Sequence, residues 1–434
     1  AILLGTFFQQ LYNTIDSVIV GQFVGKEALA AVGGSSAQIV AFVVGFFTGL
    51  SSGASVTIAQ FFGAKDSRSA NKGLHTAYAI AAFGGLILTV SGIILTPFLL
   101  EMMNTPADIV ADSAVYLRIY FAGIIFVLIY NMGSAILRAT GDSKRPLYYL
   151  IVCCIINIVL DVLFVIVFHM GVMGVAVATL IAQAVSAVLV TLKLMRSEGI
   201  LKLSVKQIRF HGSILKMQLK LGLPTGFEAI LFSITNIAIQ SAVNTFGTDT
   251  TAAWSAYGKL DAIFWMVSTA FGIAITTFVG QNYGAGKMDR VRKSTRVCLL
   301  MDFIVSAVLV VFLIAARFLL FRLFTNDSHV IEIGCDMLVL ITPWYIVYVF
   351  IEVIAGALRG VGNVVVPVAI TLLGVCVLRI AWLAAMLKIS PTISAIILSY
   401  PVTWVITALA FIIYYIYITH KTIAGSSKKH VPKL

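Results

Sequence analysis

The sequence Leu137-Arg138-Ala139-Thr140-Gly141 returns later in the chain as Leu358-Arg359-Gly360-Val361-Gly362, and 359 minus 138 is 221. A second motif repeats with the same offset, because Gln60-Phe61-Phe62-Gly63-Ala64 matches Gln281-Asn282-Tyr283-Gly284-Ala285 and 281 minus 60 is also 221. Two motifs that share one offset indicate that the chain contains an internal duplication, with one copy of each motif in each half.

The sequence around these motifs is strongly apolar. Hydrophobic residues make up 60% of the 434 residues and charged residues only 11%, and the mean hydropathy is +1.02. A soluble globular protein carries about 25% charged residues. So few charges cannot cover a surface that faces water, and the composition therefore indicates an integral membrane protein whose main partner is the lipid bilayer.

Twelve apolar runs follow one another along the chain, and a membrane-crossing helix needs roughly 20 such residues. The runs are centred near Asn13, Thr48, Leu86, Phe126, Ile156 and Leu180 and, after a basic segment, near Phe232, Ala270, Val305, Tyr345, Val375 and Ile406. We therefore predict an all-α integral membrane fold with twelve transmembrane helices.

Six predicted helices lie on each side of the basic segment. Because six is an even number, both halves enter the membrane from the same side, which predicts two six-helix lobes related by a parallel repeat. The predicted domains are an N-lobe (1–197), a basic linker on the membrane surface (198–220), a C-lobe (221–420) and a C-terminal tail (421–434).

Positive residues orient the predicted helices. The loops after the even-numbered spans, together with the tail, hold 23 of the 30 Lys and Arg residues. Such loops mark the cytoplasmic side, so we expect a multi-pass protein of the inner membrane with both termini in the cytoplasm. This topology also explains the net charge of +12 without a nucleic-acid partner. No cleavable signal peptide is visible, and because Ala1–Gly5 already reads as membrane helix, we expect the natural protein to begin earlier.

The sequence lacks the patterns of several catalytic classes. Its five cysteines include no CxxC pair, which argues against a disulfide framework or a zinc site. No HExxH and no aspartate-rich diphosphate motif is present, and the six histidines are scattered. The stretch Gly21–Glu27 is one residue short of a P-loop and lacks its Ser or Thr. We therefore expect neither an enzyme nor an ATP-driven pump, and no cofactor.

Polar residues inside the first six spans share helix faces. An ionised side chain near the bilayer centre costs about 2.5–3.5 kcal/mol, so each one indicates a function or a partner. Steps of three or four residues place side chains on one face of a helix. By this spacing the predicted faces are Gln9, Asn13 and Asp16 in the first span, Asn157 and Asp161 in the fifth, and Thr179 and Gln183 in the sixth.

We expect these faces to meet inside the N-lobe and to bring Asp16 close to Asp161. Two neighbouring carboxylates cannot both ionise at low cost, so the pair would hold a proton. A sodium ion could take the place of that proton, with Asn157 and Thr179 supplying neutral oxygens, because hard cations prefer oxygen ligands. The residues do not distinguish the two ions, and no other metal site is expected.

The C-lobe offers candidates for contact with a cationic substrate. Glu228 begins a polar stripe on the seventh span that continues through Asn236 and Gln240. Glu352 lies on the tenth span and is a further candidate. We also expect Glu352 to form an ion pair with Arg379 of the eleventh span, since charges inside a membrane usually find partners.

Several motifs resemble those of the multidrug and toxic compound extrusion (MATE) transporters, in particular the DinF-like bacterial drug exporters. Gln9–Asp16, with Val20-Gly21 and Glu27–Ala31, resembles the first span of this family. Gly280–Gly286 resembles its motif at the end of the eighth span, and Ala357–Gly362 its tenth-span ending. The resemblance covers nearly the whole chain.

The resemblance implies an antiporter that exports organic cations, including drugs, in exchange for protons or sodium by alternating access of two lobes. Archaeal and DinF-like members have an N-lobe cation site, and Asp16, Asn157, Asp161 and Thr179 match it position by position. Members of the family usually have a proline near the start of the first span, and this sequence, which begins at Ala1, does not show it. A complete twelve-span chain is expected to function as a monomer.

A flippase for lipid-linked precursors is the main alternative. Its pyrophosphate substrate would require a cavity with several cationic residues. The predicted spans hold few cations but four acids, namely Asp16, Asp161, Glu228 and Glu352. This balance favours export of organic cations.

Overall fold

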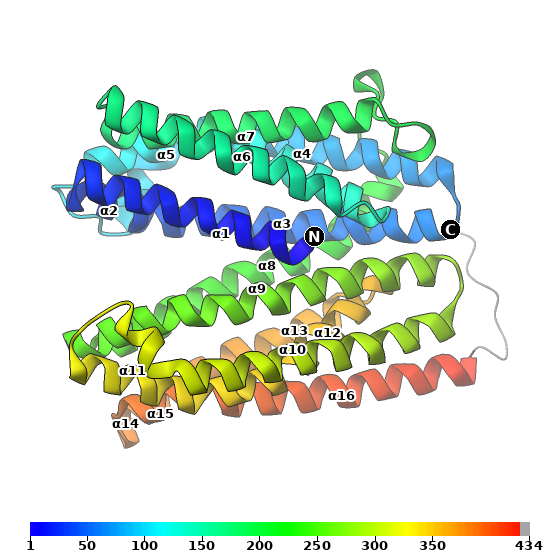
Figure 1. Cartoon of the computed structure of the whole chain (residues 1–434). Coiled ribbons are helices and arrows are strands. Elements are labelled where there is room, and N and C mark those ends of the chain that lie inside the picture. Colours follow the sequence, from blue (N-terminus) through cyan, green and yellow to red (C-terminus); the bar gives the residue numbers. More distant parts are fainter. Residues whose placement is uncertain (426–434) are drawn as a thin grey trace. The chain divides into compact units, whose positions relative to one another are not determined.

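The chain is almost entirely helical. The structure is a computed structural model that describes residues 1–425, and in that range it contains helices and turns but no strand (Figure 1). Eleven helical stretches of this range are long and apolar enough to cross a membrane. The first helix, α1 (Ile2–Ile19), is not among them, and it carries several Gln, Asn and Asp residues. The predicted all-helical membrane architecture is confirmed.

By its packing the chain divides into two compact units, residues 1–227 and 228–434. Residues 426–434, and with them most of the predicted tail, lie outside the described range. The division falls inside helix α8, and the predicted lobe boundaries stay a prediction. The helices of the first unit, followed by α8, are α1, α2 (Lys26–Gly33), α3 (Ser35–Gly63), α4 (Ser67–Met102), α5 (Val110–Ala139), α6 (Lys144–Asp161), α7 (Gly171–Met195) and α8 (Gly212–Asn244).

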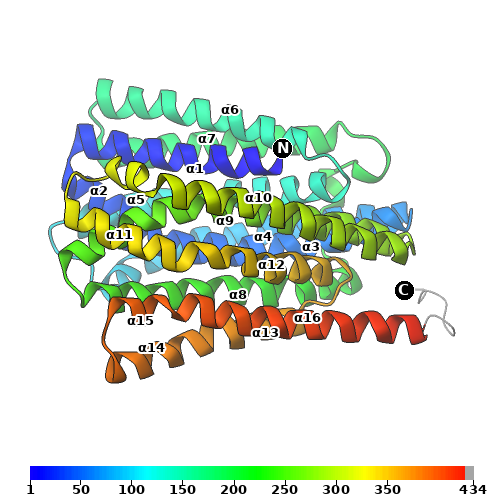
Figure 2. The ribbon, with the colours of Figure 1, turned by 60° about the horizontal axis from the view of Figure 1, so that its bottom comes forward.

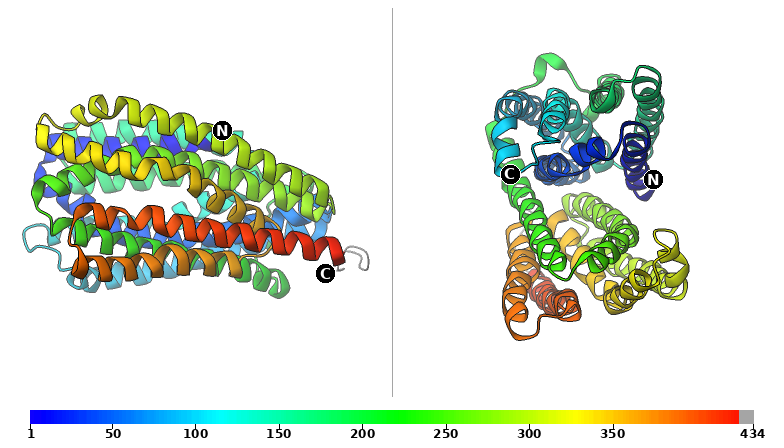
Figure 3. Two further views of the ribbon diagram at one scale, coloured as in Figure 1. Left: turned by 90° about the horizontal axis from the view of Figure 1, so that it is seen from below. Right: turned by 90° about the vertical axis from the view of Figure 1, so that its left-hand side faces the viewer.

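The second unit contains the end of α8 and eight further helices within the described range. In the right-hand view of Figure 3 many of the long helices are seen nearly end-on. These helices are α9 (Thr248–Gly284), α10 (Met288–Arg322), α11 (Ser328–Ile341), α12 (Tyr345–Gly360), α13 (Val365–Thr371), α14 (Leu378–Ile389), α15 (Ile393–Ile397) and α16 (Ser399–Gly425).

The repeated motifs end corresponding helices in the two units, α3 and α9 for one motif and α5 and α12 for the other. After these ends the backbone enters the left-handed region, which terminates helices. Positions 221 residues apart do so in the same way, with φ of 97° at Gly141 and 87° at Gly362, and 58° at Lys65 and 70° at Gly286. This agreement supports the duplication, which itself stays a prediction.

Several spans are interrupted without losing their helical course. Three π segments occur in the described residues, Val20–Val24 (η1) after α1, Val162–Val167 (η2) after α6, and Leu372–Val377 (η6) between α13 and α14. Such segments are rare and often lie at functional sites. Between α11 and α12 the 3₁₀ turn Thr342–Trp344 contains Pro343, which has no N–H to donate.

The predicted linker is only partly a loop. It contains two 3₁₀ turns, Gly199–Leu201 (η3) and Val205–Gln207 (η4), and α8 begins at Gly212, so the last part of the predicted linker is helical. Leu203 is buried in the core of the first unit. The linker is therefore attached to the first unit by packing.

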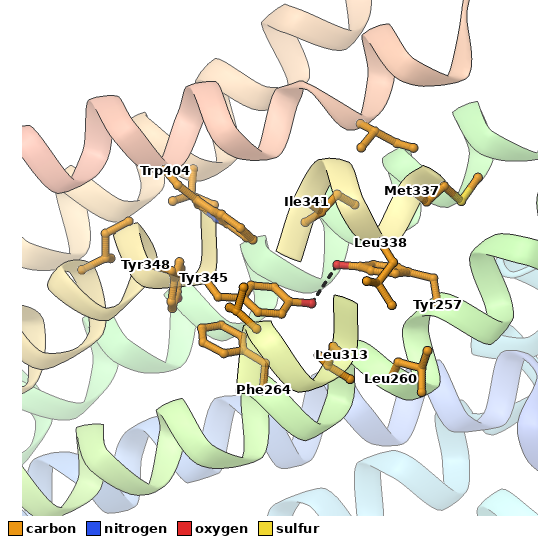
Figure 4. Packing of buried hydrophobic residues seen from close by; sticks show 14 of the residues in the cluster. Tyr257, Leu260, Phe264, Leu313, Met337, Leu338, Ile341, Tyr345, Tyr348 and Trp404 are labelled. Atoms are coloured by element: carbon orange, nitrogen blue, oxygen red, sulfur yellow. Dashed lines mark hydrogen bonds between the residues drawn. The ribbon is translucent and has the colours of Figure 1, made fainter. Parts of the chain in front are cut away.

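A group of aromatic residues packs together with aliphatic side chains in the core of the second unit (Figure 4). The rings of Phe264 and Tyr345 stack with centroids 3.9 Å apart. The hydroxyls of Tyr257 and Tyr345 are hydrogen-bonded at 2.9 Å, and Trp404 is almost fully buried beside them. A buried tyrosine hydroxyl usually has such a partner, and this one links α9 to the start of α12.

Glycines bring α3 into close contact with the first turns of α8, inside the first unit. A Cβ atom on Gly49 would meet the backbone of Gly226, and one on Gly53 would meet the backbone of Gly222. Small residues of this kind let membrane helices approach closely. The early part of α8 is therefore held against α3 by backbone contact.

Gly49→Ala is expected to destabilise the protein by about 1–3 kcal/mol, because the added methyl group has to displace backbone rather than a flexible side chain. SDS-induced unfolding in mixed micelles would measure the change in the free energy of unfolding. The matched control is Gly258→Ala inside α9, where the added methyl group meets nothing within 4 Å. Equal effects of the two substitutions would contradict the close α3–α8 contact.

Candidate functional site

The predicted N-lobe residues come from three helices that lie side by side (Figure 2). Asp16 lies in the last turn of α1, just before the π segment η1. Asp161 ends α6 and is followed directly by η2, while Asn157 lies one turn earlier. Thr179 lies on α7. Both acids therefore stand where a regular helix changes into a π segment.

The structure buries all four residues. The exposed fraction is 9% for Asp16, 1% for Asn157, 0% for Asp161 and 8% for Thr179. An isolated buried carboxylate would be very costly, so acids in such a place need a partner or a proton. Asp16 and Asp161 are the only acids of residues 1–227 that the structure buries.

The four side chains contact one another. The carboxyl group of Asp16 contacts both the carboxyl group of Asp161 and the hydroxyl of Thr179. Asn157 Nδ2 donates a hydrogen bond to Thr179 Oγ1 at 3.5 Å. Predicted helix faces that are far apart in the sequence therefore meet in one buried cluster, which we call the carboxyl pair site.

The oxygens of the carboxyl pair site lack donors. Asp16 Oδ1, both carboxyl oxygens of Asp161 and Asn157 Oδ1 are buried without a hydrogen-bond partner. Neither acid forms an ion pair with a Lys or Arg in residues 1–425. A proton shared between the carboxyl groups or a small hard cation among these oxygens would satisfy them, whereas a soft metal would prefer sulfur or nitrogen.

Tyrosines surround the carboxyl pair site, and the sequence analysis did not assign them to it. Tyr116 of α5 lies near both acids, and its ring stacks on that of Tyr120 with centroids 6.2 Å apart. Tyr12 is buried one helical turn before Asp16 and accepts a hydrogen bond from Gln183 Nε2 at 3.4 Å. The four-residue step from Tyr12 to Asp16 was the signal that could have identified it.

The structure brings only one of the three auxiliary residues to this site. Gln183 is buried and bonded to Tyr12. Gln9 and Asn13 are exposed. Asn13 lies toward the edge of the face that α1 buries, because a helix turns about 100° per residue and Tyr12 lies nearer than Asn13 to the direction of Asp16. Gln9 is almost in line with Asp16 but lies two turns earlier, in the part of α1 before Tyr12 where no residue is buried.

The second unit holds a separate group of charges around Glu228, which is 9% exposed. Glu228 contacts Thr371 of α13 and lies near the charges of Glu352 and Arg359 on α12. Arg359 Nη2 and Glu352 Oε1 form an ion pair at 3.0 Å. Two acids thus share one arginine inside the span.

The predicted ion pair between Glu352 and Arg379 is wrong. Glu352 pairs with Arg359 instead, because a separation of seven residues is two helical turns and places both on one face of α12. Arg379 donates to Thr403 Oγ1 at 3.0 Å, and its guanidinium lies 4.0 Å from the centroid of the Tyr400 ring. This cation–π contact stabilises the arginine without an acid in direct contact.

The other predicted residues of α8 do not join this group. Gln240 donates to Asn244 Oδ1 at 2.7 Å, and Asn236 is exposed. Asp261 of α9, by contrast, accepts hydrogen bonds from Tyr345 at 2.5 Å and Trp265 at 2.7 Å. The hydroxyl of Tyr257 lies 3.3 Å from Asp261 and 2.9 Å from Tyr345, and its one proton goes to the nearer oxygen, that of Tyr345. Two short hydrogen bonds give this acid a structural role.

Asp302 of α10 is a buried acid that the sequence analysis missed. It is fully buried and accepts a hydrogen bond from Ser306 at 3.2 Å, but Oδ2 has no partner. It lies near the charge of Glu352. A single aspartate inside the apolar run of Cys298–Ala315 was the signal for it.

Arg359→Met is expected to destabilise the protein by about 1.5–3 kcal/mol, because it leaves Glu352 as a half-buried acid without the cation that donates to it. SDS titration would measure the loss, and the double variant Arg359→Met with Glu352→Met should recover most of it. Arg145→Gln is the control, since its pair with Asp142 is exposed and contributes about 0–1 kcal/mol. A loss for Arg359→Met no larger than that of the control would contradict a stabilising pair at this place.

Comparisons with known proteins identify the family. The MatE family model matches residues 1–163 and 224–383. YoeA of Bacillus subtilis, named a probable multidrug resistance protein, is 30% identical over 382 residues, which cover 86% of this chain and 82% of that protein. The probable multidrug resistance protein NorM of Thermotoga maritima is 28% identical over 392 residues, covering 88% and 82%.

Solved structures show the same fold. A multidrug resistance MATE family transporter in an outward-facing conformation matches with a TM-score of 0.91 at 21% identity, over 99% of this chain and 95% of that one. A MOP superfamily transporter from Pyrococcus furiosus matches with a TM-score of 0.90 at 20% identity, over 99% and 95%. The family match and the membrane-spanning helices together show that this chain belongs to the MatE family of membrane efflux transporters, as its motifs predict.

Proposed function

We propose that the chain is a secondary active antiporter that exports organic cations, including drugs, in exchange for protons or sodium ions. The observation that carries this proposal is the carboxyl pair site, with its two acids in contact and its buried oxygens without donors. The names of the relatives, which are multidrug resistance and export proteins, support the substrate class.

The proposed cycle uses the carboxyl pair site as the place where the coupling ion binds. In the inward-open form the protein takes up an organic cation while Asp16 and Asp161 carry no ion. After the lobes have reoriented, a proton or sodium ion from outside binds the pair and favours release of the drug. Asn157 and Thr179 would supply oxygens to sodium, whereas the carboxyl contact alone suffices for a proton.

The membrane potential does not drive this exchange when one monovalent drug leaves for each monovalent ion that enters. One elementary charge moved through 100 mV is worth about 2.3 kcal/mol, and opposite movements of equal charge cancel this contribution. The concentration gradients of the two species then provide the driving force. We propose that the protein lies in the cytoplasmic membrane with both termini inside, because the positive residues gather in the loops of one side. We also propose that it functions as a monomer, since a chain with both lobes needs no partner to complete them.

A lipid-linked precursor flippase remains the second candidate, and the partners of the intramembrane arginines argue against it. Arg359 forms an ion pair with Glu352, and Arg379 donates a hydrogen bond to Thr403 and makes a cation–π contact with Tyr400. A pyrophosphate would have to displace these partners. Transport of an organic cation requires no such exchange.

Asp16→Asn and Asp161→Asn are each expected to abolish export driven by an ion gradient while the protein still binds drug, because an amide cannot exchange a proton or neutralise a cation. The measurement is movement of a fluorescent organic cation in proteoliposomes with a proton gradient or a sodium gradient imposed separately. Asp112→Asn, in the first turn of α5, is the control. Undiminished export by either variant would refute the proposed coupling site.

No dye movement by the folded wild-type protein under either gradient would contradict export of organic cations and favour a lipid substrate. Movement under one gradient alone would identify the coupling ion. Both results are read from the same proteoliposomes.

Thr179→Val is expected to affect the two ions differently. It removes a ligand oxygen but leaves both carboxyl groups, so sodium-driven export should fall about tenfold or more, as when the surroundings of a metal ion are changed, whereas proton-driven export should change little. The control is Thr191→Val on the same helix. An equal loss with both ions would show that Thr179 only links α7 to its neighbours.

A further inference from the structure

A basic cavity lies in the first unit, away from the carboxyl pair site. Its volume is about 320 Å³, roughly ten times the share of one water molecule in the liquid. It lies between the start of α4 and the segment that leads into α8. The lining contains no acidic residue and consists of Arg68, Asn71, Lys72, His75, Lys206, Gln207, Arg209 and His211.

Hydrogen bonds hold the two walls of this cavity together. Asn71 Nδ2 donates to the carbonyl oxygens of Ile200 and Lys202, both at 3.1 Å. His75 is 1% exposed, and its Nε2 accepts from the backbone N–H of Ser204 at 3.0 Å. Its Nδ1 donates to the carbonyl oxygen of Asn71 at 2.8 Å. With both ring nitrogens engaged, His75 fixes the linker on α4.

His211 completes the wall on the side of α8. Its Nδ1 is 3.1 Å from Thr76 Oγ1, and its Nε2 accepts from Arg209 Nε at 3.4 Å. Partial burial, followed by the nearby charges of Arg209 and Lys72, lowers the pKa of His211. A neutral His211 can accept from Arg209, and it thereby orients the guanidinium.

Four positive side chains line the cavity without an anion. Arg68, Lys72, Lys206 and Arg209 form no ion pair with an acid of residues 1–425, and the acid whose charge lies near Arg68, Asp66, is not part of the lining. Four like charges around one small space repel one another, and a bound anion would relieve this repulsion. The donors of Asn71 are already used by the linker, so the charged side chains are the groups left to bind a ligand.

The residue types indicate a phosphate group. Arg and Lys bind phosphate oxygens through charge-assisted hydrogen bonds. No Phe, Tyr or Trp lines the cavity, so nothing there would stack on a nucleotide base. Basic pockets at the membrane surface are typical sites for anionic lipid headgroups. We propose that this cavity binds a phosphate group, presented either by the headgroup of an anionic phospholipid or by free inorganic phosphate.

Calorimetric titration of the purified protein in a neutral detergent tests this proposal. The probes are dihexanoyl-phosphatidylglycerol, inorganic phosphate at constant ionic strength, and dihexanoyl-phosphatidylcholine as the zwitterionic control. Binding of phosphatidylglycerol alone would identify a lipid headgroup as the source of the phosphate. Binding of inorganic phosphate would identify the free ion. Binding of neither probe by the wild-type protein would overturn the proposal.

Two variants and a control distinguish a built site from general attraction of anions. Lys72→Gln with Lys206→Gln should weaken binding about tenfold or more, because two charged donors are lost. Asn71→Ala keeps all four charges but releases the linker, and it should also weaken binding. Lys287→Gln with Arg296→Gln removes two charges outside the cavity and should have little effect. Unchanged binding by Asn71→Ala, or an equal loss in the control, would show diffuse attraction and overturn the site.

Discussion

Backbone N–H and C=O groups inside the hydrocarbon core of a membrane have no water to bond, and each unsatisfied group costs several kcal/mol. The chain meets this constraint by remaining helical across its apolar runs, and even its interruptions are π segments or a 3₁₀ turn. Side chains are under the same constraint. A buried acid needs donors from the protein, a partner of opposite charge, a proton or a cation, and the buried acids of this chain can be sorted by which of these they have.

Asp261 and the carboxyl pair site illustrate the difference. Asp261 accepts short hydrogen bonds from Tyr345 and Trp265, which leaves little for an ion to improve. Asp161 has no donor at either oxygen and lies against a second acid. Both kinds of acid look alike in the sequence as single charges in apolar runs. The environment of the first gives it a structural role, whereas the second is the acid for which we propose ion binding.

Much of the fold and of the carboxyl pair site could be predicted from the sequence, because helical periodicity is local. Asn157 and Asp161 share a face whatever the rest of the chain does, and the matching motifs located the helix ends. The partners of charged side chains were harder to predict from the sequence. Glu352 pairs with Arg359 of its own helix rather than with Arg379, and the cation–π contact of Arg379 with Tyr400 depends on how α14 packs against α16. Tyr12 was missed because the helix-face analysis considered Gln, Asn, Asp and Thr residues but no tyrosine. Asp302 was missed because it belongs to neither the shared helix faces nor the repeated motifs.

The passage of the chain through α8 has a mechanical consequence. The backbone leaves the first unit and enters the second once, between Phe227 and Glu228, in the middle of a helix. Pro224 lies three residues before this point and removes one hydrogen bond from the helix. The turns before Glu228 are held against α3 by the contacts of Gly222 and Gly226, whereas Glu228 itself belongs to the acids of the second unit. The turn that Pro224 weakens lies between Gly222 and Gly226, so the backbone contacts with α3 brace the helix on both sides of the missing hydrogen bond, one turn before Glu228.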